Sequence, residues 1–139
     1  MKRSHRLIIL LFFIPFIMAM SSLGGDSPDK IPVPAKKFLG LFVDQMDVIT
    51  DAKEISIDGG TFLEGKKGEG TFTVAFENIQ YVNFLLRDEK LIAVVKLREG
   101  SSLELVVNKK AKAYGKTKFG AFQIKLLDLK RMTITNIKK

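Results

Sequence analysis

The segment GKKGEGTFTVAFENIQYVNF, residues 65–84, decides the fold, because it returns fifty residues later as GKTKFGAFQIKLLDLKRMTI, residues 115–134. Glycines bracket a short loop at the start of both segments, and apolar residues recur at matching places through the remainder. The residues upstream extend the match at the same offset, so the sequence predicts two repeats, residues 41–84 and 91–134. A duplicated unit is therefore expected to have built the fold.

The first part of each repeat is predicted to be extended. Residues 91–97 are rich in β-branched and aliphatic side chains, and a Gly-containing loop separates them from residues 103–107. This pattern is typical of a β-hairpin. Residues 41–49 could form a short helix by their own pattern, but the matching stretch of the second repeat favours a strand.

The second part of each repeat predicts strand, single helical turn, strand. In residues 71–76 and 121–126, apolar residues alternate with small or polar ones, which indicates strands with one buried face. A polar step follows, and we expect its one apolar residue, Ile79 or Leu129, to plug the end of the core. This pattern resembles the closure of small SH3-like and Sm-like barrels.

The fold class that follows is all-β: one small barrel or sandwich of two pseudo-equivalent repeats with single helical turns. One shared core is expected, because a β unit of about 45 residues without disulfides buries too little surface alone. The bracketing glycines predict unusual backbone angles or a close approach of two strands. They do not predict a phosphate-binding loop, which also needs a Gly-Lys-Ser/Thr ending and a helix. The phenylalanines are expected as core residues or loop plugs, not as a stacking platform: Phe62, Phe72, Phe76, Phe84, Phe119 and Phe122.

The N-terminus has the pattern of an export signal. Basic residues precede an apolar run over residues 7–20, and small residues follow it. The run is shorter than the roughly 20 residues of a spanning helix, so a cleaved signal peptide over residues 1–24 is favoured over an uncleaved signal that anchors the protein. Cleavage could follow Ser21 or Gly24. A Pro-rich leader, residues 25–37, would then precede the β domain, residues 38–139, in a periplasmic or secreted protein.

The composition excludes much chemistry from the exported chain. The sequence has no Cys, and its single His, His5, lies in the segment expected to be removed. This leaves no imidazole base, no thiol nucleophile, no disulfide and no nitrogen or sulfur ligand for a transition metal. We therefore expect a protein that is not an enzyme, with no cofactor, no metal site and no catalytic residues.

The two repeats carry opposite charge. Residues 41–84 contain three cations and eight acids, whereas residues 91–134 contain ten cations and three acids. One interpretation is that the opposite charges help the two repeats to pair, a modest effect at exposed sites. The other is a basic surface for an anionic partner, such as an anionic lipid, a cell-wall polymer or an acidic protein. The candidate residues for that surface are Lys109, Lys110, Lys112, Lys116 and Lys118.

Other ligands and activities are less favoured by the sequence. Export and the lack of an aromatic-interleaved basic signature argue against nucleic acid. Asp44, Asp47 and Asp51 lack the spacing of an EF-hand and are interpreted as loop acids. The acids of the first repeat could supply a pair for glycoside cleavage, although their spacing in sequence does not give their spacing in space.

The pattern over residues 41–134 resembles that of small exported bacterial β-repeat proteins of unassigned function, in which a Gly-bracketed loop precedes a strand, a turn and a further strand. The resemblance implies the fold and the location and brings no site residues. The leading hypothesis is an exported, non-enzymatic β domain that binds or scaffolds in the cell envelope. The first alternative is a basic adaptor on an anionic lipid or polymer, and the second is a carboxylate-dependent hydrolase. Exposed strand edges or the opposed charges could also produce a homo-oligomer.

Overall fold

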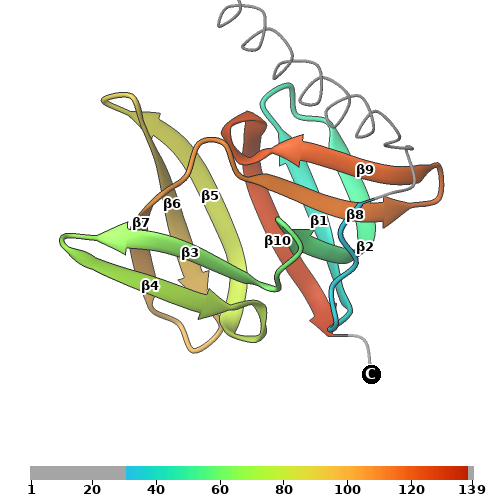
Figure 1. Cartoon of the computed structure of the whole chain (residues 1–139), viewed down its shortest axis with the longest axis horizontal. Helices are drawn as coiled ribbons and strands as arrows, with labels where there is room; N and C mark the ends of the chain where they lie inside the picture. The colour runs from blue at the N-terminus through green and yellow to red at the C-terminus, as the bar shows by residue number, and fades with distance from the viewer. Residues whose placement is uncertain (1–30, 138–139) are drawn as a thin grey trace, which may run out of the picture. The chain divides into compact units, whose positions relative to one another are not determined.

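The structure is a computed structural model, and it describes residues 31–137 (Figure 1). The expected signal peptide and the first part of the leader lie outside the described residues. The described chain is all-β, which confirms the predicted fold class. No helix within residues 31–137 has the length and apolar character needed to cross a membrane.

Ten strands and two single 3-10 turns make up the fold. In chain order the elements are β1 (Phe38–Asp44), β2 (Ile49–Ile57), β3 (Phe62–Lys67), β4 (Gly70–Ala75), η2 (Phe76–Asn78), β5 (Ile79–Arg87), β6 (Lys90–Leu97), β7 (Ser102–Val107), β8 (Lys112–Thr117), β9 (Gly120–Lys125), η3 (Leu126–Asp128) and β10 (Leu129–Ile137).

The strands form one sheet in the order β4-β3-β7-β6-β5-β10-β1-β2-β8-β9, and all neighbours whose register is resolved are antiparallel. The sheet consists of two halves of five strands each, which are joined where β5 pairs with β10. The contiguous half consists of β3 to β7, which follow one another in sequence, and occupies the left of Figure 1. The split half consists of β1 and β2 together with β8, β9 and β10, on the right. Each half thus combines strands from both predicted repeats.

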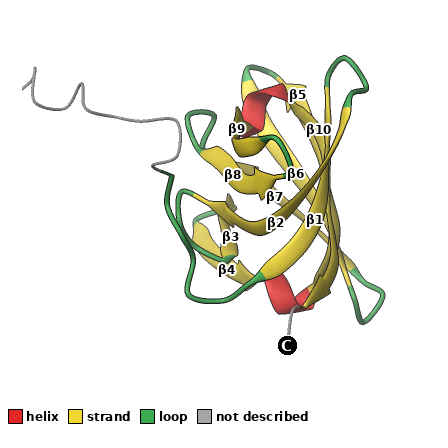
Figure 2. Cartoon of the chain, turned by 90° about the vertical axis from the view of Figure 1, so that its right-hand side faces the viewer, coloured by secondary structure: helices red, strands yellow, loops and turns green. Residues whose placement is uncertain are grey.

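The predicted strand, single turn, strand is present twice, as β4-η2-β5 and β9-η3-β10. Figure 2 shows the two short turns near opposite ends of the sheet. Each turn begins earlier than predicted, with Phe76 or Leu126 as its buried residue. Ile79 and Leu129 open the strands that follow and are fully buried, so they do close the core.

The first glycine of each loop is needed because a neighbouring strand passes close to its Cα atom. A Cβ on Gly65 would lie 2.8 Å from Cβ of Leu105, and a Cβ on Gly115 would lie 2.9 Å from Cβ of Ala52. Both glycines therefore let β3 or β8 cross a neighbouring strand of the other repeat. At the second rim, Gly120 has a φ of 127°, which a side chain rarely adopts.

The pairing of the strands shows that the two halves correspond at two different offsets in sequence. Phe42 pairs with Met132 in the split half, and Val95 pairs with Val82 in the contiguous half. Met132 follows Val82 by 50 residues, whereas Val95 follows Phe42 by 53. Hence β3 to β5 match β8 to β10 at the offset read from the sequence, but β1 and β2 match β6 and β7 three residues further on. The difference is a three-residue extension of β2, Ile55–Ile57.

The strand predicted over residues 41–49 is correct only in part. Strand β1 ends at Asp44, whose carboxylate accepts hydrogen bonds from the backbone N–H groups of Met46 and Val48 at 2.8 and 3.0 Å. An Asp that binds the backbone two residues on favours a turn over an extended chain. Residues 45–48 therefore form the turn of a hairpin, and β2 starts at Ile49.

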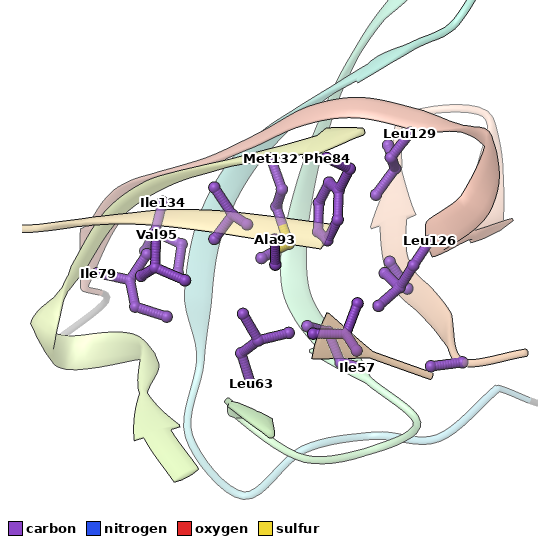
Figure 3. Close-up of a cluster of buried hydrophobic side chains, with 14 of the residues drawn as sticks. Ile57, Leu63, Ile79, Phe84, Ala93, Val95, Leu126, Leu129, Met132 and Ile134 are labelled. Atoms are coloured by element: carbon purple, nitrogen blue, oxygen red, sulfur yellow. The ribbon is translucent and has the colours of Figure 1, made fainter. Parts of the chain in front are cut away.

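Both halves contribute to one buried cluster, as predicted. Figure 3 shows this cluster, and its labelled side chains include Val95 and Leu63 of the contiguous half together with Met132 and Leu126 of the split half. All buried core residues among those described fall between Phe38 and Ile134, and residues 31–139 form one compact unit. The core of the described residues therefore lies within the compact unit that begins at Ile31.

The prediction that six phenylalanines are core residues or plugs is right for only some of them. Phe76 and Phe84 are buried. Phe122 is half-buried and stacks on Phe42, with ring centroids 5.5 Å apart. The prediction is wrong for the other three, since Phe62, Phe72 and Phe119 are exposed.

Candidate functional site

An exposed apolar surface with lysines around it lies at the β8–β9 end of the split half. Phe119 is 88% exposed, Ile49 65% and Val48 55%. Together with Lys53, Lys116 and Lys118, these residues border a groove of about 890 Å³. We call these six residues the tip surface. Exposed apolar groups that gather at one place mark interaction sites.

The β8–β9 hairpin projects Phe119 into solvent. Its turn contains only Lys118 and Phe119, between the ends of the two strands. The Thr117 hydroxyl accepts a hydrogen bond from the backbone N–H of Phe119 at 3.0 Å and donates one to the carbonyl of Gly120 at 2.9 Å. Nζ of Lys118 lies 5.2 Å from the centroid of the Phe119 ring. The sequence thus fixes a tight turn whose apolar side chain has no core to enter.

The β1–β2 hairpin supplies the other side of the surface. The Asp44 carboxylate holds the backbone N–H of Val48, so Val48 and Ile49 follow directly after a fixed turn. Leu39 and Phe122 form part of the groove wall and are half-buried. The apolar character of the surface therefore continues from the hairpin tip into the groove.

The charge of the tip surface is mainly positive. Lys116 lies 3.3 Å from the Glu54 carboxylate. Among the ion pairs of the described residues, none includes Lys53 or Lys118. Asp51 is the one acid that lines the groove. Two lysines thus remain available to an anionic partner beside the apolar residues.

The structure does not bring the five predicted lysines together. Lys116 and Lys118 belong to the tip surface. Lys109 and Lys110 lie in the connection from β7 to β8, and Lys112 is the first residue of β8. A strand advances about 3.3 Å per residue, so β8 separates these three from the tip. Sequence reasoning missed Val48, Ile49, Lys53 and Phe119, although Ile49 and Lys53 fit an alternating pattern that exposes every second residue of β2.

The equivalent surface of the contiguous half is polar. Glu69 takes the place of Phe119 at the β3–β4 tip, and Ser101 and Ser102 take the places of Val48 and Ile49. Lysines are present there too, at Lys66 and Lys67. Val106, which is 38% exposed, takes the place of Lys53, and Gly68 takes that of Lys118, so the two tips differ in both their apolar and their basic residues.

Opposite charges also join the two repeats. Lys116 pairs with Glu54, and Lys130 pairs with Asp47, so in both cases a lysine of the second repeat meets an acid of the first. The acids considered for calcium serve local roles: Asp44 caps its turn and Asp47 holds Lys130. Within residues 31–137 no group of three or more acids, His or Cys could hold a metal ion.

Comparison with known proteins gives a family and no named function. No curated protein and no solved structure matches the chain. A family model described as "Uncharacterised protein" matches residues 34–136. That match begins before β1 and ends one residue before the end of β10, so the chain belongs to this family of uncharacterised proteins.

Proposed function

We propose that this protein is a non-enzymatic binding domain of the cell envelope, and that it attaches to anionic lipid surfaces through the tip surface. The export signal expected over residues 1–24 supports a periplasmic or secreted location. The observation that carries the proposal is Phe119, 88% exposed at a hairpin tip between basic residues. Its equivalent in the other half is an acid, Glu69.

The energetics favour a lipid interface as the partner of such a tip. Moving an exposed Phe side chain into an apolar environment is worth about 1.5–3 kcal/mol. Each lysine near an anionic leaflet contributes about 1 kcal/mol. Phe119 with Lys53 and Lys118 therefore gives a reversible attachment whose basic part weakens as salt screens the charges.

A binding role also agrees with how the described acids are used. Asp58 accepts a hydrogen bond from the backbone N–H of Lys112, and Glu99 accepts from Ser101. Glu54 and Glu104 are paired with cations. These carboxylates stabilise turns and strand contacts, which is a structural use and not an acid–base one.

The proposal is tested by co-sedimentation of residues 25–139 with vesicles. Phosphatidylglycerol vesicles should bind the protein at low salt, and binding should weaken at high salt. Pure phosphatidylcholine vesicles should bind it much less. Equal binding to both lipids, or none to either, would reject the proposal.

Two variants show whether the tip surface is responsible. The double variant Lys118→Gly/Phe119→Glu gives the β8–β9 tip the residues of the β3–β4 tip, and we expect at least a tenfold loss of binding. The control, Lys109→Glu/Lys110→Glu, changes the net charge more but lies beyond the other end of β8. It should retain binding. A greater loss in the control would mean that overall charge, not the tip surface, drives the attachment.

A further inference from the structure

The contiguous half contains a groove where the split half contains a closed strand seam. This groove, of about 630 Å³, lies between β3 and β7 and near the connections that join the two halves. We call it the seam groove. Its lining includes Leu63, Glu64, Gly65, Val106, Val107 and Asp58.

The groove exists because β3 and β7 pair only at one end. A single residue pair, Lys66↔Val106, joins these strands. In the split half the equivalent pair, Lys53↔Lys116, is followed by a bulge and two further pairs, Ser56↔Tyr114 and Ile57↔Ala113. The residues that make those further pairs belong to the three-residue extension of β2. Strand β7 has no such extension and ends at Val107.

Within residues 31–137, the missing extension leaves part of β3 without a strand neighbour on that side. Leu63 and Glu64 correspond to Ala113 and Tyr114 of the split half. They pair with Val74 and Thr73 of β4, on the opposite side of β3. An uncovered strand flank is a template for pairing with another chain. Peptides that add to such a flank gain affinity from backbone hydrogen bonds and specificity from pockets for alternate side chains.

The split half shows which chemistry suits this place. There the extension is Ile55-Ser56-Ile57, with Ile55 and Ser56 fully buried and Ile57 9% exposed. The seam groove has matching apolar surfaces: Leu63 and Val107 are buried at its wall, and Phe62 and Val106 are exposed at 41% and 38%. An aliphatic residue on either side of a small one therefore fits both seams.

The acidic residues of the groove favour a segment with basic residues beside the small residue and its two aliphatic neighbours. Asp58 and Glu64 both line the groove, and Lys66 lies at the end where the strands pair. No ion pair within the described residues involves Asp58 or Glu64. A cationic residue beside the motif would meet these carboxylates.

We propose that the seam groove binds an extended segment of a partner protein, which adds as a strand beside β3 at Leu63 and Glu64. The segment has an aliphatic-small-aliphatic core with basic residues next to it. It begins beside Val107, which lies against Gly65 as Ile55 lies against Gly115, and continues in the place that Ser56 and Ile57 take in the split half. This site is separate from the tip surface and does not depend on lipid attachment.

The direct test is fluorescence anisotropy with labelled peptides and residues 25–139. The probe is Lys-Lys-Ile-Ser-Ile-Lys, with Lys-Lys-Pro-Ser-Pro-Lys as a control that cannot pair as a strand. A third peptide, Glu-Glu-Ile-Ser-Ile-Glu, tests the charge. The probe should bind saturably, and each of the other two should bind at least tenfold more weakly. Absence of saturable binding by the probe, or equal binding of all three, would overturn the proposal.

Two protein variants locate the binding. Insertion of Ile-Ser-Ile between Val107 and Asn108 copies the extension of β2 and should close the seam, which would abolish probe binding. Glu64→Lys changes an exposed side chain and should weaken probe binding at least tenfold with the fold intact. The probe should also slow hydrogen exchange at whichever backbone amide of Leu63 and Glu64 points away from β4, because neighbouring residues of a strand direct their N–H groups to opposite sides. Binding that neither variant weakens, or a groove filled by a second copy as judged by concentration-dependent size, would contradict the proposal.

Discussion

The contiguous half and the split half have the same five-strand arrangement, and two of their differences lie at the hairpin tips and at the seams. At the hairpin tips, Phe119 in the split half corresponds to Glu69 in the contiguous half. At the seams, three residue pairs join β2 to β8, and one joins β3 to β7. One scaffold thus carries an apolar tip with a closed seam and a polar tip with an open seam. The comparison indicates that the shared residues maintain the fold, and the differing ones form the two surfaces for which binding is proposed.

The largest effect is expected from the residue that closes the seam of the split half. Ile55 is fully buried, so Ile55→Ala should lower the free energy of unfolding by about 2–5 kcal/mol. Val107 borders the open seam, and Val107→Ala should cost only about 1–2 kcal/mol. Urea unfolding measures both. A loss at Ile55 no greater than that at Val107 would mean that the two seams are equally packed.

The glycines that permit strand crossing should behave alike in the two halves. Gly65→Ala and Gly115→Ala each force a Cβ to within 3.0 Å of a neighbouring side chain, which should cost about 1–3 kcal/mol. In Gly70→Ala the nearest atom is 3.8 Å away, so the change should stay within about 0.5 kcal/mol. Thermal unfolding of the three variants makes the comparison. If Gly65→Ala or Gly115→Ala were as mild as the control, close approach would not explain that glycine.

A pair of equivalent contacts joins the β6–β7 hairpin to the chain near η2 and the β1–β2 hairpin to the chain near η3. Arg98 donates to the carbonyls of Glu77 and Ile134, and Gln45 donates to that of Leu129. Arg98→Ala should cost about 1.5–3 kcal/mol because its hydrogen bonds come from a charged group, and Gln45→Ala about 0.5–1.5 kcal/mol. Chemical denaturation should rank the two in that order. The reverse order would show that the split half depends more on its turn.

The smallest effect concerns Glu77 of the contiguous half. The corresponding residue of the split half is Leu127, which carries no charge. The hydrogen bond from the Lys36 ammonium, together with a backbone hydrogen bond, lowers the pKa of the Glu77 carboxyl. The folded-state pKa then lies below the unfolded one, so this contribution is present at neutral pH. It is lost as the pH falls from about 4.5 through the lowered value. At this exposed pair it amounts to less than about 1 kcal/mol.

Comparison of acid unfolding measures that contribution. Glu77→Gln should reduce the dependence of stability on pH below about 5, with little change at pH 7 beyond the loss of the ion pair. Lys36→Met provides the matched control, since it removes the partner and leaves the carboxyl. An unchanged acid transition in both variants would contradict the assignment.

The strand, turn, strand arrangement was predictable because its two copies share a pattern without a gap. The first two strands were predictable only in part, because the extra residues of β2 change the offset that matches β1 and β2 to β6 and β7 from 50 to 53. An odd shift in register exchanges the faces of a strand. Leu91 is 2% exposed, whereas Leu41, which the offset of 50 aligns with it, is only half-buried. Only the pairing of the strands shows that Leu41 corresponds to Val94.

The candidate site was predictable in part for a related reason. Lys116 and Lys118 were found because they flank the second glycine loop. Lys109 and Lys110 are close to them in sequence, but an extended strand places them far away in space. Phe119 looked like a plug, because its apolar character does not tell whether a turn directs it inward. Val48 and Ile49 join the surface through a hairpin that is distant in sequence, and no local pattern indicates that contact.

The most direct test of this account uses the absence of Trp from the sequence. Phe119→Trp and Glu69→Trp each place one fluorescent reporter at an equivalent tip, and the two tips lie on opposite sides of the domain in Figure 1. With phosphatidylglycerol vesicles, the emission of the Phe119→Trp protein should shift to shorter wavelength, and that of the Glu69→Trp protein should not change. A shift in both proteins, or in neither, would contradict the claim that the split half alone carries the lipid-binding tip.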